Sequence, residues 1–209
     1  MNPFWVVAGP DYAGKSTVLG HLDAHHNWRV VSYDDQYLDR YPLIRQLRRD
    51  WVETAFSWTD RRYSAELVLS VLHPIVLHLR DELYRADQAD RVIVDSYYYK
   101  LLAKCRLLGV GHKPIFDYWR SFPRPQGVVY LDVAPEVAWA RSGHGAQLNV
   151  FEHYGTTADR ADFTRLQSQL REAILEEVGD VPLSIIDGEG RLDAVMSDLL
   201  AALDLAAVR

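Results

Sequence analysis

The stretch GPDYAGKST, from Gly9 to Thr17, constrains the fold of this chain more than any other feature. It lies between a short apolar run, Phe4–Ala8, and a segment of helical character that starts at Lys15. A Gly-x-x-x-x-Gly-Lys-Ser pattern between a strand and a helix is typical of a loop that binds phosphates. Its glycines let backbone N–H groups point inward around the phosphates, and the helix N-terminus adds partial positive charge. We therefore expect a nucleotide-binding protein.

The chemistry of phosphoryl transfer predicts roles for single residues of this loop. Lys15 is expected to reach the β- and γ-phosphates, and the hydroxyl of Ser16 to ligate Mg²⁺. ATP and Mg²⁺ are the predicted cofactors. The residues expected to contact the nucleotide are Gly9, Asp11, Tyr12, Ala13, Gly14, Lys15, Ser16 and Thr17.

Apolar runs and helical spacing predict the rest of the architecture. Strands are expected at residues 4–8, 29–33, 91–95, 127–133 and 182–187, and helices at 15–25, 41–51, 61–86, 97–108, 135–142, 159–178 and 190–205. Short, continuously apolar strands separated by helices are typical of parallel pairing with both faces covered. The prediction is an α/β P-loop NTPase fold, a doubly wound five-stranded parallel sheet with helices on both faces, forming a single kinase domain over residues 1–209.

Three segments between or within these elements are less regular. Pro74 is expected to kink or divide the long helix at 61–86. Residues 109–125 are expected to be irregular, as are those at about 142–158. The second stretch is rich in Gly, His, Asn and Thr, and is either a mobile lid or an ordinary surface loop.

Composition excludes several classes of protein. The formal net charge of −6 gives no basic excess for general nucleic-acid binding. Cys105 is the one cysteine, so no disulfide can form within the chain, which suits a reducing compartment. No signal peptide is expected, and no apolar run approaches the ~20 residues that a membrane span needs. The expectation is a soluble cytoplasmic protein that binds neither nucleic acid nor membrane.

A carboxylate that ends a strand of the same sheet can complete a magnesium site. Asp95 ends the run RVIVD, and Asp132 ends another strand and competes for this role. We favour Asp95, because a tyrosine-rich segment follows it in the expected active-site crevice. Ser16 and Asp95 are thus the predicted metal ligands.

Several stretches together resemble the thymidylate kinase family. GPDYAGKST is similar to its phosphate loop, VVYLDVAPEVAWAR to its Leu-Asp-Val-x-Pro-Glu-x-Ala strand and helix, and VIVDSYYYKLLAKC lies where that family has a strand followed by Asp-Arg-Tyr. The segments FSWTDRRYSAELVLSVLHPIV, NVFEHY and IIDGEGRLDAVMSDLLAAL resemble others in the same order. The resemblance covers nearly the whole chain and implies a small-molecule kinase, with a homodimer as its expected assembly.

The resemblance also implies roles for particular residues. Asp11 matches an acidic loop residue that contacts the acceptor sugar, and Arg61 an arginine that contacts the acceptor nucleotide. Phe56 matches a neighbouring aromatic residue of the base pocket. Asp95 matches a carboxylate near metal and phosphates, and Arg141 an arginine at the edge of the lid, where it is expected to act in catalysis.

This sequence departs from the family pattern around the acceptor. Ser96 replaces the arginine that grips the acceptor phosphate in the family, and serine cannot act as a charged bidentate clamp. Lys100 lies one helical turn further on and is expected to compensate in part. Tyr12 replaces a glycine of the loop. Tyr97, in the tyrosine run that follows Ser96, is a candidate for an aromatic acceptor pocket.

A second departure favours a different acceptor. SYDDQYLDR stands where the family has Arg-Glu-Pro-Gly, and its carboxylates resemble those of P-loop kinases that act on hydroxyls of small molecules such as uridine. Asp34 or Asp35 would accept the hydroxyl proton there. Both are also plausible as solvated loop residues or helix caps.

Two acceptor classes therefore stay open. The family resemblance favours a nucleoside monophosphate, whereas the departures favour a hydroxyl of a nucleoside or an unrelated small molecule. A nucleotide-binding switch without transfer activity is a third, less favoured reading of the same motifs.

Overall fold

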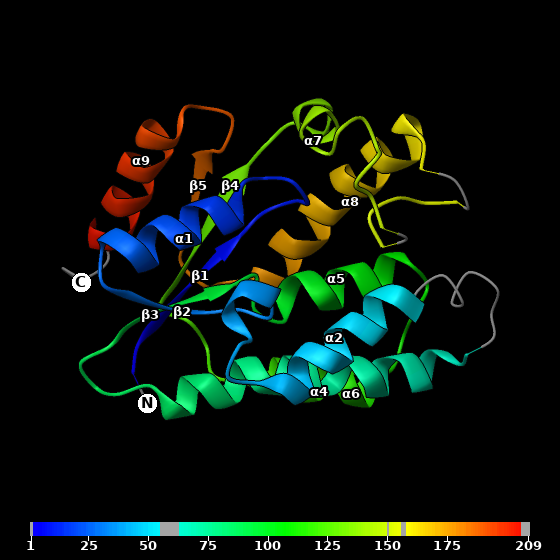
Figure 1. The fold of residues 1–209 in the computed structure, drawn as a ribbon, viewed down its shortest axis with the longest axis horizontal. Coiled ribbons are helices and arrows are strands. Elements are labelled where there is room, and N and C mark those ends of the chain that lie inside the picture. The colour runs from blue at the N-terminus through cyan, green and yellow to red at the C-terminus, as the bar shows by residue number, and fades with distance from the viewer. Residues whose placement is uncertain (1, 55–62, 150, 156–157, 206–209) are drawn as a thin grey trace.

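A five-stranded sheet forms the centre of the molecule in the computed structural model (Figure 1), which describes residues 2–54, 63–149, 151–155 and 158–205. Its strands are β1 (Phe4–Ala8), β2 (Trp28–Val31), β3 (Arg91–Asp95), β4 (Gly127–Asp132) and β5 (Leu183–Asp187). Every pair is parallel, and the order is β2-β3-β1-β4-β5. The predicted doubly wound parallel sheet is confirmed.

The helices lie on both faces of this sheet. They are α1 (Lys15–His25), the 3-10 turn η1 (Asp35–Tyr37), α2 (Pro42–Thr54), α4 (Ala65–Arg85), α5 (Tyr99–Leu107), α6 (Lys113–Arg120), α7 (Pro135–Arg141), α8 (Arg160–Val178) and α9 (Leu192–Leu205). Figure 1 shows α1 and α9 together on one side, and α2, α4, α5 and α6 on the other.

Alternating side chains of β1 supply both halves of the core. Phe4 and Val6 pack in the cluster that includes residues of α4, α5 and α6, whereas Trp5 and Val7 pack in the cluster of α1 and α9. All of these side chains are buried. Each such burial is worth about 1.5–3 kcal/mol, so a strand that is apolar at every position is stable only between two layers of helices.

Helix α4 runs unbroken through Pro74, so the expected division of this helix is not found. Ser64 caps its N-terminus by accepting a hydrogen bond from the backbone N–H of Leu67 at 3.1 Å. Leu69, Leu72 and other residues on its inner face are buried against the sheet. This packing holds the helix together although proline lacks an N–H donor.

One helix, α6, lies in a segment that was expected to be irregular. His112 caps it through Nδ1, which accepts from the N–H of Ile115 at 3.3 Å. Trp119 is fully buried, and its indole N–H donates to Nδ1 of His73 in α4 at 2.9 Å. An eight-residue helix is too short to be stable by itself, so this contact with α4 and not local propensity stabilises it.

The carboxyl ends of the strands meet along one edge of the sheet. Because β2, β3 and β1 are neighbours, the residues that follow them are brought together although they are far apart in the sequence. Ligands of open α/β sheets bind in the crevice at this edge. Within the described residues, no helix has the length and apolar character needed to cross a membrane.

Candidate active site

The phosphate loop joins β1 to α1 and depends on two glycines. A Cβ atom at Gly9 would lie 2.8 Å from the carbonyl oxygen of Leu131, which is too close for any side chain. Gly14 has φ +89° and precedes the first residue of α1. Left-handed backbone favours glycine here, and it turns the loop so that the first N–H groups of α1 face the crevice.

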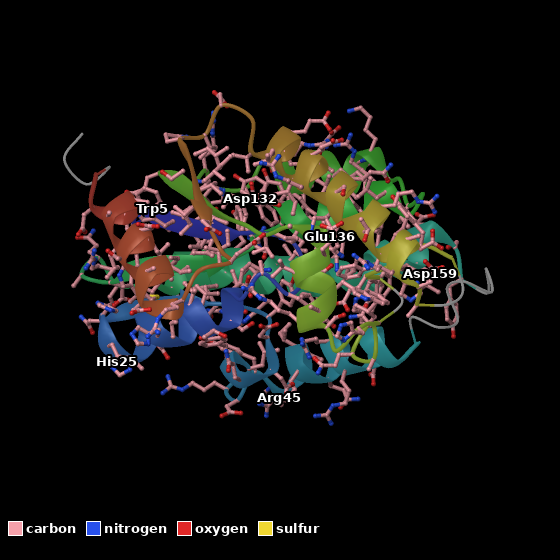
Figure 2. The ribbon with its side chains drawn as sticks, turned by 90° about the horizontal axis from the view of Figure 1, so that it is seen from above. Trp5, His25, Arg45, Asp132, Glu136 and Asp159 are labelled. Atoms are coloured by element: carbon pink, nitrogen blue, oxygen red, sulfur yellow. The ribbon has the colours of Figure 1, made fainter. Side chains whose placement is uncertain are left out.

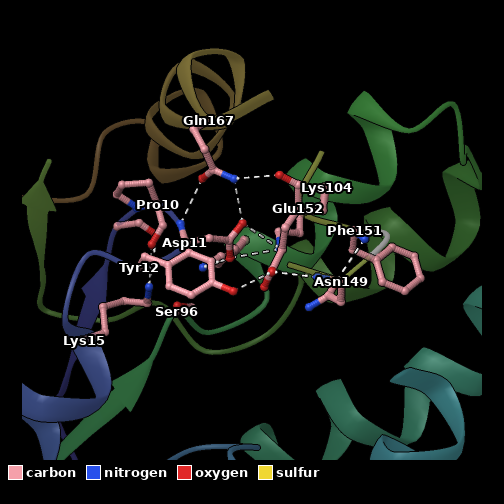
Figure 3. Close-up of polar contacts among 12 residues, drawn as sticks. Pro10, Asp11, Tyr12, Lys15, Ser96, Lys104, Asn149, Phe151, Glu152 and Gln167 are labelled. Atoms are coloured by element: carbon pink, nitrogen blue, oxygen red, sulfur yellow. Dashed lines mark hydrogen bonds and ion pairs between the residues drawn. The ribbon is translucent and has the colours of Figure 1, made fainter. Parts of the chain in front are cut away.

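Lys15 is buried at the start of α1 (Figure 3). Its ammonium donates to the carbonyl oxygens of Pro10, at 2.8 Å, and Gly9, at 3.3 Å. Burial and the nearby charge of Lys100 lower the pKa of Lys15 to about 7, although Asp95 and Asp11 oppose this shift. A triphosphate bound at the loop would favour the charged form, because it adds negative charge within reach of the ammonium.

Asp11 forms the centre of a buried ion cluster. Its carboxylate lies 2.7 Å from the ammonium of Lys100 and 2.9 Å from that of Lys104, both on α5. Gln167 on α8 donates to the same carboxylate and accepts from the N–H of Asp11, each at 2.9 Å. Burial alone would raise the pKa of Asp11, but the two lysines outweigh it and hold this pKa well below its usual range.

Tyr12 points from the phosphate loop to the segment that follows α7, as Figure 3 shows. Its hydroxyl donates to the carbonyl of Gln147 at 2.8 Å and lies 3.1 Å from the carboxylate of Glu152. Its backbone is left-handed, with φ +60°. Burial and the charge of Glu152 raise the pKa of Tyr12 above its ordinary value, so the hydroxyl stays a hydrogen-bond donor.

Asp95 is buried at the end of β3 and is held from both sides by serine hydroxyls. Ser32 donates to Oδ2 at 3.0 Å, and Ser96 donates to Oδ1 at 2.9 Å. Burial raises the pKa of Asp95, although the charge of Lys15 works in the opposite direction. Ser96, which the sequence places where the family has an arginine, thus supports a carboxylate.

Asp34 faces the phosphate loop from the end of β2. The hydroxyl of Ser16 donates to its Oδ2 at 2.9 Å, and the guanidinium of Arg48 lies 3.7 Å from its Oδ1. Ser16, Asp34 and Asp95 therefore bring one hydroxyl and two carboxylates into the same cavity. This all-oxygen donor set suits Mg²⁺, which prefers carboxylates, hydroxyls and water to nitrogen or sulfur. The described residues contain no group of three or more His, Cys, Asp or Glu side chains that could hold a metal by themselves.

These residues line a cavity of about 500 Å³ that runs from the phosphate loop to an aromatic pair. Trp51 of α2 and Phe151 stack there with ring centroids 4.5 Å apart and an angle of 14° between their planes. Its apolar wall comes from α4, α5 and the residues that follow α5, and consists of Leu72, Ile75, Leu101, Cys105, Leu108 and Val110. A cavity that is polar at one end and aromatic at the other suits a ligand with a charged group and a flat ring.

Arg141 lines the cavity from the last turn of α7, on the side of the phosphate loop. Its guanidinium donates to the carbonyl oxygens of Gly188, at 3.0 Å, and Tyr12, at 3.4 Å. Since both partners are neutral carbonyls, the positive charge of Arg141 is not neutralised by these bonds.

Three residues that the sequence singled out lie elsewhere. Tyr97 is fully buried, with its hydroxyl on the carbonyl of Pro123, so it is a core residue and not a cavity residue. Asp35 lies in η1 outside the cavity and pairs with Arg45, which projects outward from α2 in Figure 2. Asp132 accepts two hydrogen bonds of 2.9 Å from Arg171, so it does not compete for the metal.

Most of the remaining predicted residues line the cavity, and two lie outside the described part of the chain. Asp11, Tyr12, Ala13, Gly14, Lys15, Ser16, Thr17, Asp34, Asp95, Lys100 and Arg141 all line the cavity. Phe56 and Arg61 lie outside the described residues. Gly9 contributes through its backbone carbonyl, which accepts from Lys15.

Sequence reasoning missed Glu152 and Gln167. Gln167 is almost fully buried between apolar neighbours on α8, and a polar residue on an apolar helix face is the signal that could have revealed it. Burial and the charge of Asp11 raise the pKa of Glu152, which lines the cavity. Glu152 lies in the segment NVFEHY, which resembles the family, but this resemblance gave it no role, and its partners Tyr12 and Gln167 are distant in the sequence.

No protein-family model matches the chain. Among curated proteins, the thymidylate kinase of Dictyostelium discoideum is 21% identical over 204 residues, which cover 96% of this chain and 84% of that protein. The probable thymidylate kinase 1 of Saccharolobus solfataricus is 26% identical over 145 residues, which cover 68% of this chain and 70% of that protein.

Solved structures share the fold at lower identity. The thymidylate kinase from Candida albicans superposes with a TM-score of 0.68 at 17% identity, covering 98% of this chain and 92% of that one. A deoxyadenosine kinase from M. mycoides with bound dATP superposes with a TM-score of 0.60 at 16% identity. The match covers 96% of this chain and 98% of that one. The chain thus has the fold of P-loop kinases, and its sequence is similar to thymidylate kinases.

Proposed function

We propose that this kinase transfers the γ-phosphoryl group of ATP, with Mg²⁺, to a hydroxyl group of a nucleoside-like acceptor. One observation carries this proposal: the carboxylate of Asp34 lies in the cavity, 2.9 Å from the hydroxyl of Ser16 at the phosphate loop. A hydroxyl must lose its proton as it attacks, and a carboxylate at this place is suited to accept it.

The charges of the cavity support a neutral acceptor. Four carboxylates line it: Asp11, Asp34, Asp95 and Glu152. Lys100 and Lys104, which also line the cavity, are ion-paired with Asp11. Lys15, Arg48 and Arg141 line the cavity as well, so the repulsion is local: the carboxylate of Asp34, beside Ser16, would repel a phosphate monoester but not a hydroxyl.

The shape of the cavity supports a nucleoside-like ring. The stacked pair Trp51 and Phe151 lies at the end away from the phosphate loop, next to the apolar wall of α4 and α5. Stacking on aromatic rings favours a flat heterocycle, and the charged end of the cavity is left for the reacting groups. Of the solved neighbours, the deoxyadenosine kinase is named for a nucleoside substrate.

Each residue then has a defined task. Lys15 and the first N–H groups of α1 bind the donor phosphates, and Asp34 accepts the proton of the attacking hydroxyl. Ser16 and Asp95 would hold Mg²⁺, which supplies positive charge to the phosphates when bound. Arg141 adds a further positive charge at the loop. Asn149, Phe151 and Glu152 line the cavity and would act in a lid that excludes water from it.

A nucleoside monophosphate is the second candidate acceptor. Two observations favour it: Lys100 and Lys104 supply positive charge inside the cavity, and the curated relatives are named thymidylate kinases. In that case the acceptor phosphate would compete with Asp11 for the two lysines, and Asp34 would have no proton to accept.

An ADP-release assay across nucleosides and their 5′-monophosphates separates the two candidates. We expect turnover with a nucleoside, and a fall in kcat of roughly 10²–10⁴-fold for Asp34→Asn. Asp35→Asn is the matched control, because Asp35 is the adjacent carboxylate but lies outside the cavity. Turnover of dTMP but of no nucleoside, with Asp34→Asn as active as the wild type, would show that the acceptor group is a phosphate.

A further inference from the structure

We infer that Ser32 is a positioning residue that holds Asp34 and Asp95 at one fixed spacing in the cavity. The inference rests on the proposed function, in which these two carboxylates act together on one reaction. Ser32 follows the last residue of β2, and Val31 is paired with Val94 of β3. The parallel register therefore places Ser32 beside Asp95, which follows Val94.

The hydroxyl of Ser32 contacts both carboxylate residues. It donates to Oδ2 of Asp95 at 3.0 Å and accepts from the backbone N–H of Asp34 at 3.0 Å. The side chain is almost fully buried, with 2% of the residue exposed. An N–H group can only donate, so the single hydroxyl hydrogen of Ser32 is left for Asp95. The direction of both hydrogen bonds is thus determined.

This arrangement links two loops that are 63 residues apart in the sequence. Asp34 follows β2, and its carboxylate reaches the hydroxyl of Ser16 at 2.9 Å. Asp95 ends β3, and Ser32 is the side chain that joins the two. Loss of the hydroxyl would leave the N–H of Asp34 and Oδ2 of Asp95 each without this partner, and the turn after β2 could then shift relative to β3.

Ser96 offers a natural comparison. It also donates a hydroxyl to Asp95, at Oδ1 and 2.9 Å, but its own N–H is anchored to the carbonyl of Val7 in β1 at 2.8 Å. Ser96 therefore orients Asp95 alone, whereas Ser32 orients Asp95 and the backbone that carries Asp34. Groups that orient metal ligands in this way typically change metal affinity or activity by about 10–100-fold when removed.

Three substitutions at Ser32 test this role, two of which form a matched pair. Ser32→Thr keeps the hydroxyl, and Ser32→Val has nearly the same shape as threonine but no hydroxyl. Ser32→Ala removes the hydroxyl with the least change in volume. Binding of Mn²⁺ in the presence of a non-hydrolysable ATP analogue is followed by electron paramagnetic resonance, which needs no acceptor. We expect Mn²⁺ affinity to fall about 10–100-fold in Ser32→Ala and Ser32→Val, and to be close to wild type in Ser32→Thr.

A double-substitution cycle tests the link to Asp34. For Ser32→Ala with Asp34→Asn, the loss of kcat is expected to be smaller than the product of the two single losses, because both act on the same group. For Ser96→Ala with Asp34→Asn, the loss of kcat is expected to equal the product of the losses in Ser96→Ala and Asp34→Asn.

Two results would overturn the inference. One is equal Mn²⁺ affinity in Ser32→Val and Ser32→Thr, and the other is a multiplicative loss in the Ser32 cycle. Failure of the wild type itself to bind Mn²⁺ with the ATP analogue is a different outcome, because it would overturn the proposed function along with the role of Ser32.

Discussion

Asp11 is ion-paired with two lysines inside the cavity, Lys100 and Lys104. Its carboxylate lies 2.7 Å from Lys100 and 2.9 Å from Lys104, and Gln167 holds it in place. A residue so engaged has little capacity left to contact a sugar hydroxyl. We propose instead that Asp11 sets the charge of the acceptor site, by keeping two ammonium groups from binding a phosphate.

Replacement of Asp11 by asparagine is expected to change acceptor preference. Lys100 and Lys104 become available, and a hydrogen bond to a charged group is worth about 1.5–3 kcal/mol, so a nucleoside 5′-monophosphate should bind roughly tenfold or more tightly relative to the nucleoside. Calorimetric titration with both ligands measures this ratio. Asp11→Asn with Lys104→Met is the control, because it removes the surplus buried charge. An unchanged ratio in Asp11→Asn would contradict this role.

At the scale of elements, Tyr12 connects the phosphate loop to the segment after α7. Its hydroxyl reaches Gln147 and Glu152, and Gln167 of α8 donates to the carbonyl of Glu152 at 3.3 Å. The loop that we propose binds the donor phosphates and the segment that lines the cavity are therefore connected by side-chain hydrogen bonds. This connection gives Tyr12 a physical role in a position where the sequence resemblance implies glycine.

Tyr12→Phe removes the hydroxyl and keeps the ring beside Phe163. One hydrogen bond is worth about 0.5–1.5 kcal/mol net, so the segment should open about 2–12 times more often, and ATP hydrolysis without acceptor should rise by a similar factor. Tyr154→Phe is the matched control, since Tyr154 donates from the same segment to Gln169 on the exposed side of α8. Equal hydrolysis rates in Tyr12→Phe and the wild type would argue against the connection.

The fold was largely predictable from the sequence, because apolar runs of buried strands are local signals. The runs at 4–8 and 91–95 match β1 and β3 at both ends. Helix α6 was not predicted, because its stability depends on Trp119 packing against α4. The phosphate loop was likewise a local signal, and every residue from Asp11 to Thr17 lines the cavity.

The rest of the site depends on contacts between distant residues. The sequence favoured Asp95 over Asp132 only through the tyrosines that follow it, whereas in the structure Arg171, on another helix, binds Asp132. Tyr97 was expected in the acceptor pocket, but Ser96 and Tyr97 both have left-handed backbone, with φ of +55° and +46°. This unusual turn directs the ring of Tyr97 into the core, and no sequence pattern indicates it.

For the whole molecule, an ion cluster stabilises the layer of helices that supports the cavity. Glu177 of α8 lies 2.7 Å from Arg106 of α5 and 2.7 Å from Arg120 of α6, and only 5% of its side chain is exposed. Burial would raise the pKa of Glu177, but hydrogen bonds from the two arginines outweigh it and lower this pKa. The ionised form is therefore favoured in the folded state.

Glu177→Gln should lower the free energy of unfolding by about 1–3 kcal/mol at pH 7. Because the folded-state pKa lies below the unfolded one, the stabilisation is present above the unfolded pKa and is lost as pH falls through the folded pKa. The difference in free energy of unfolding between the wild type and Glu177→Gln should thus become smaller from pH 7 toward pH 3. Urea unfolding of both proteins at several pH values measures it, and a penalty that does not change with pH would rule out a charge effect.

The central claim is that the accepting atom is a hydroxyl oxygen. ³¹P nuclear magnetic resonance of the reaction products tests it directly, because it identifies the atom to which the new phosphoryl group is bound. The account predicts that incubation with ATP, Mg²⁺ and the nucleosides gives a new phosphate monoester resonance. It would be contradicted by a second diphosphate, beside the ADP that every transfer leaves, that forms only with nucleoside monophosphates as their monoester resonance disappears.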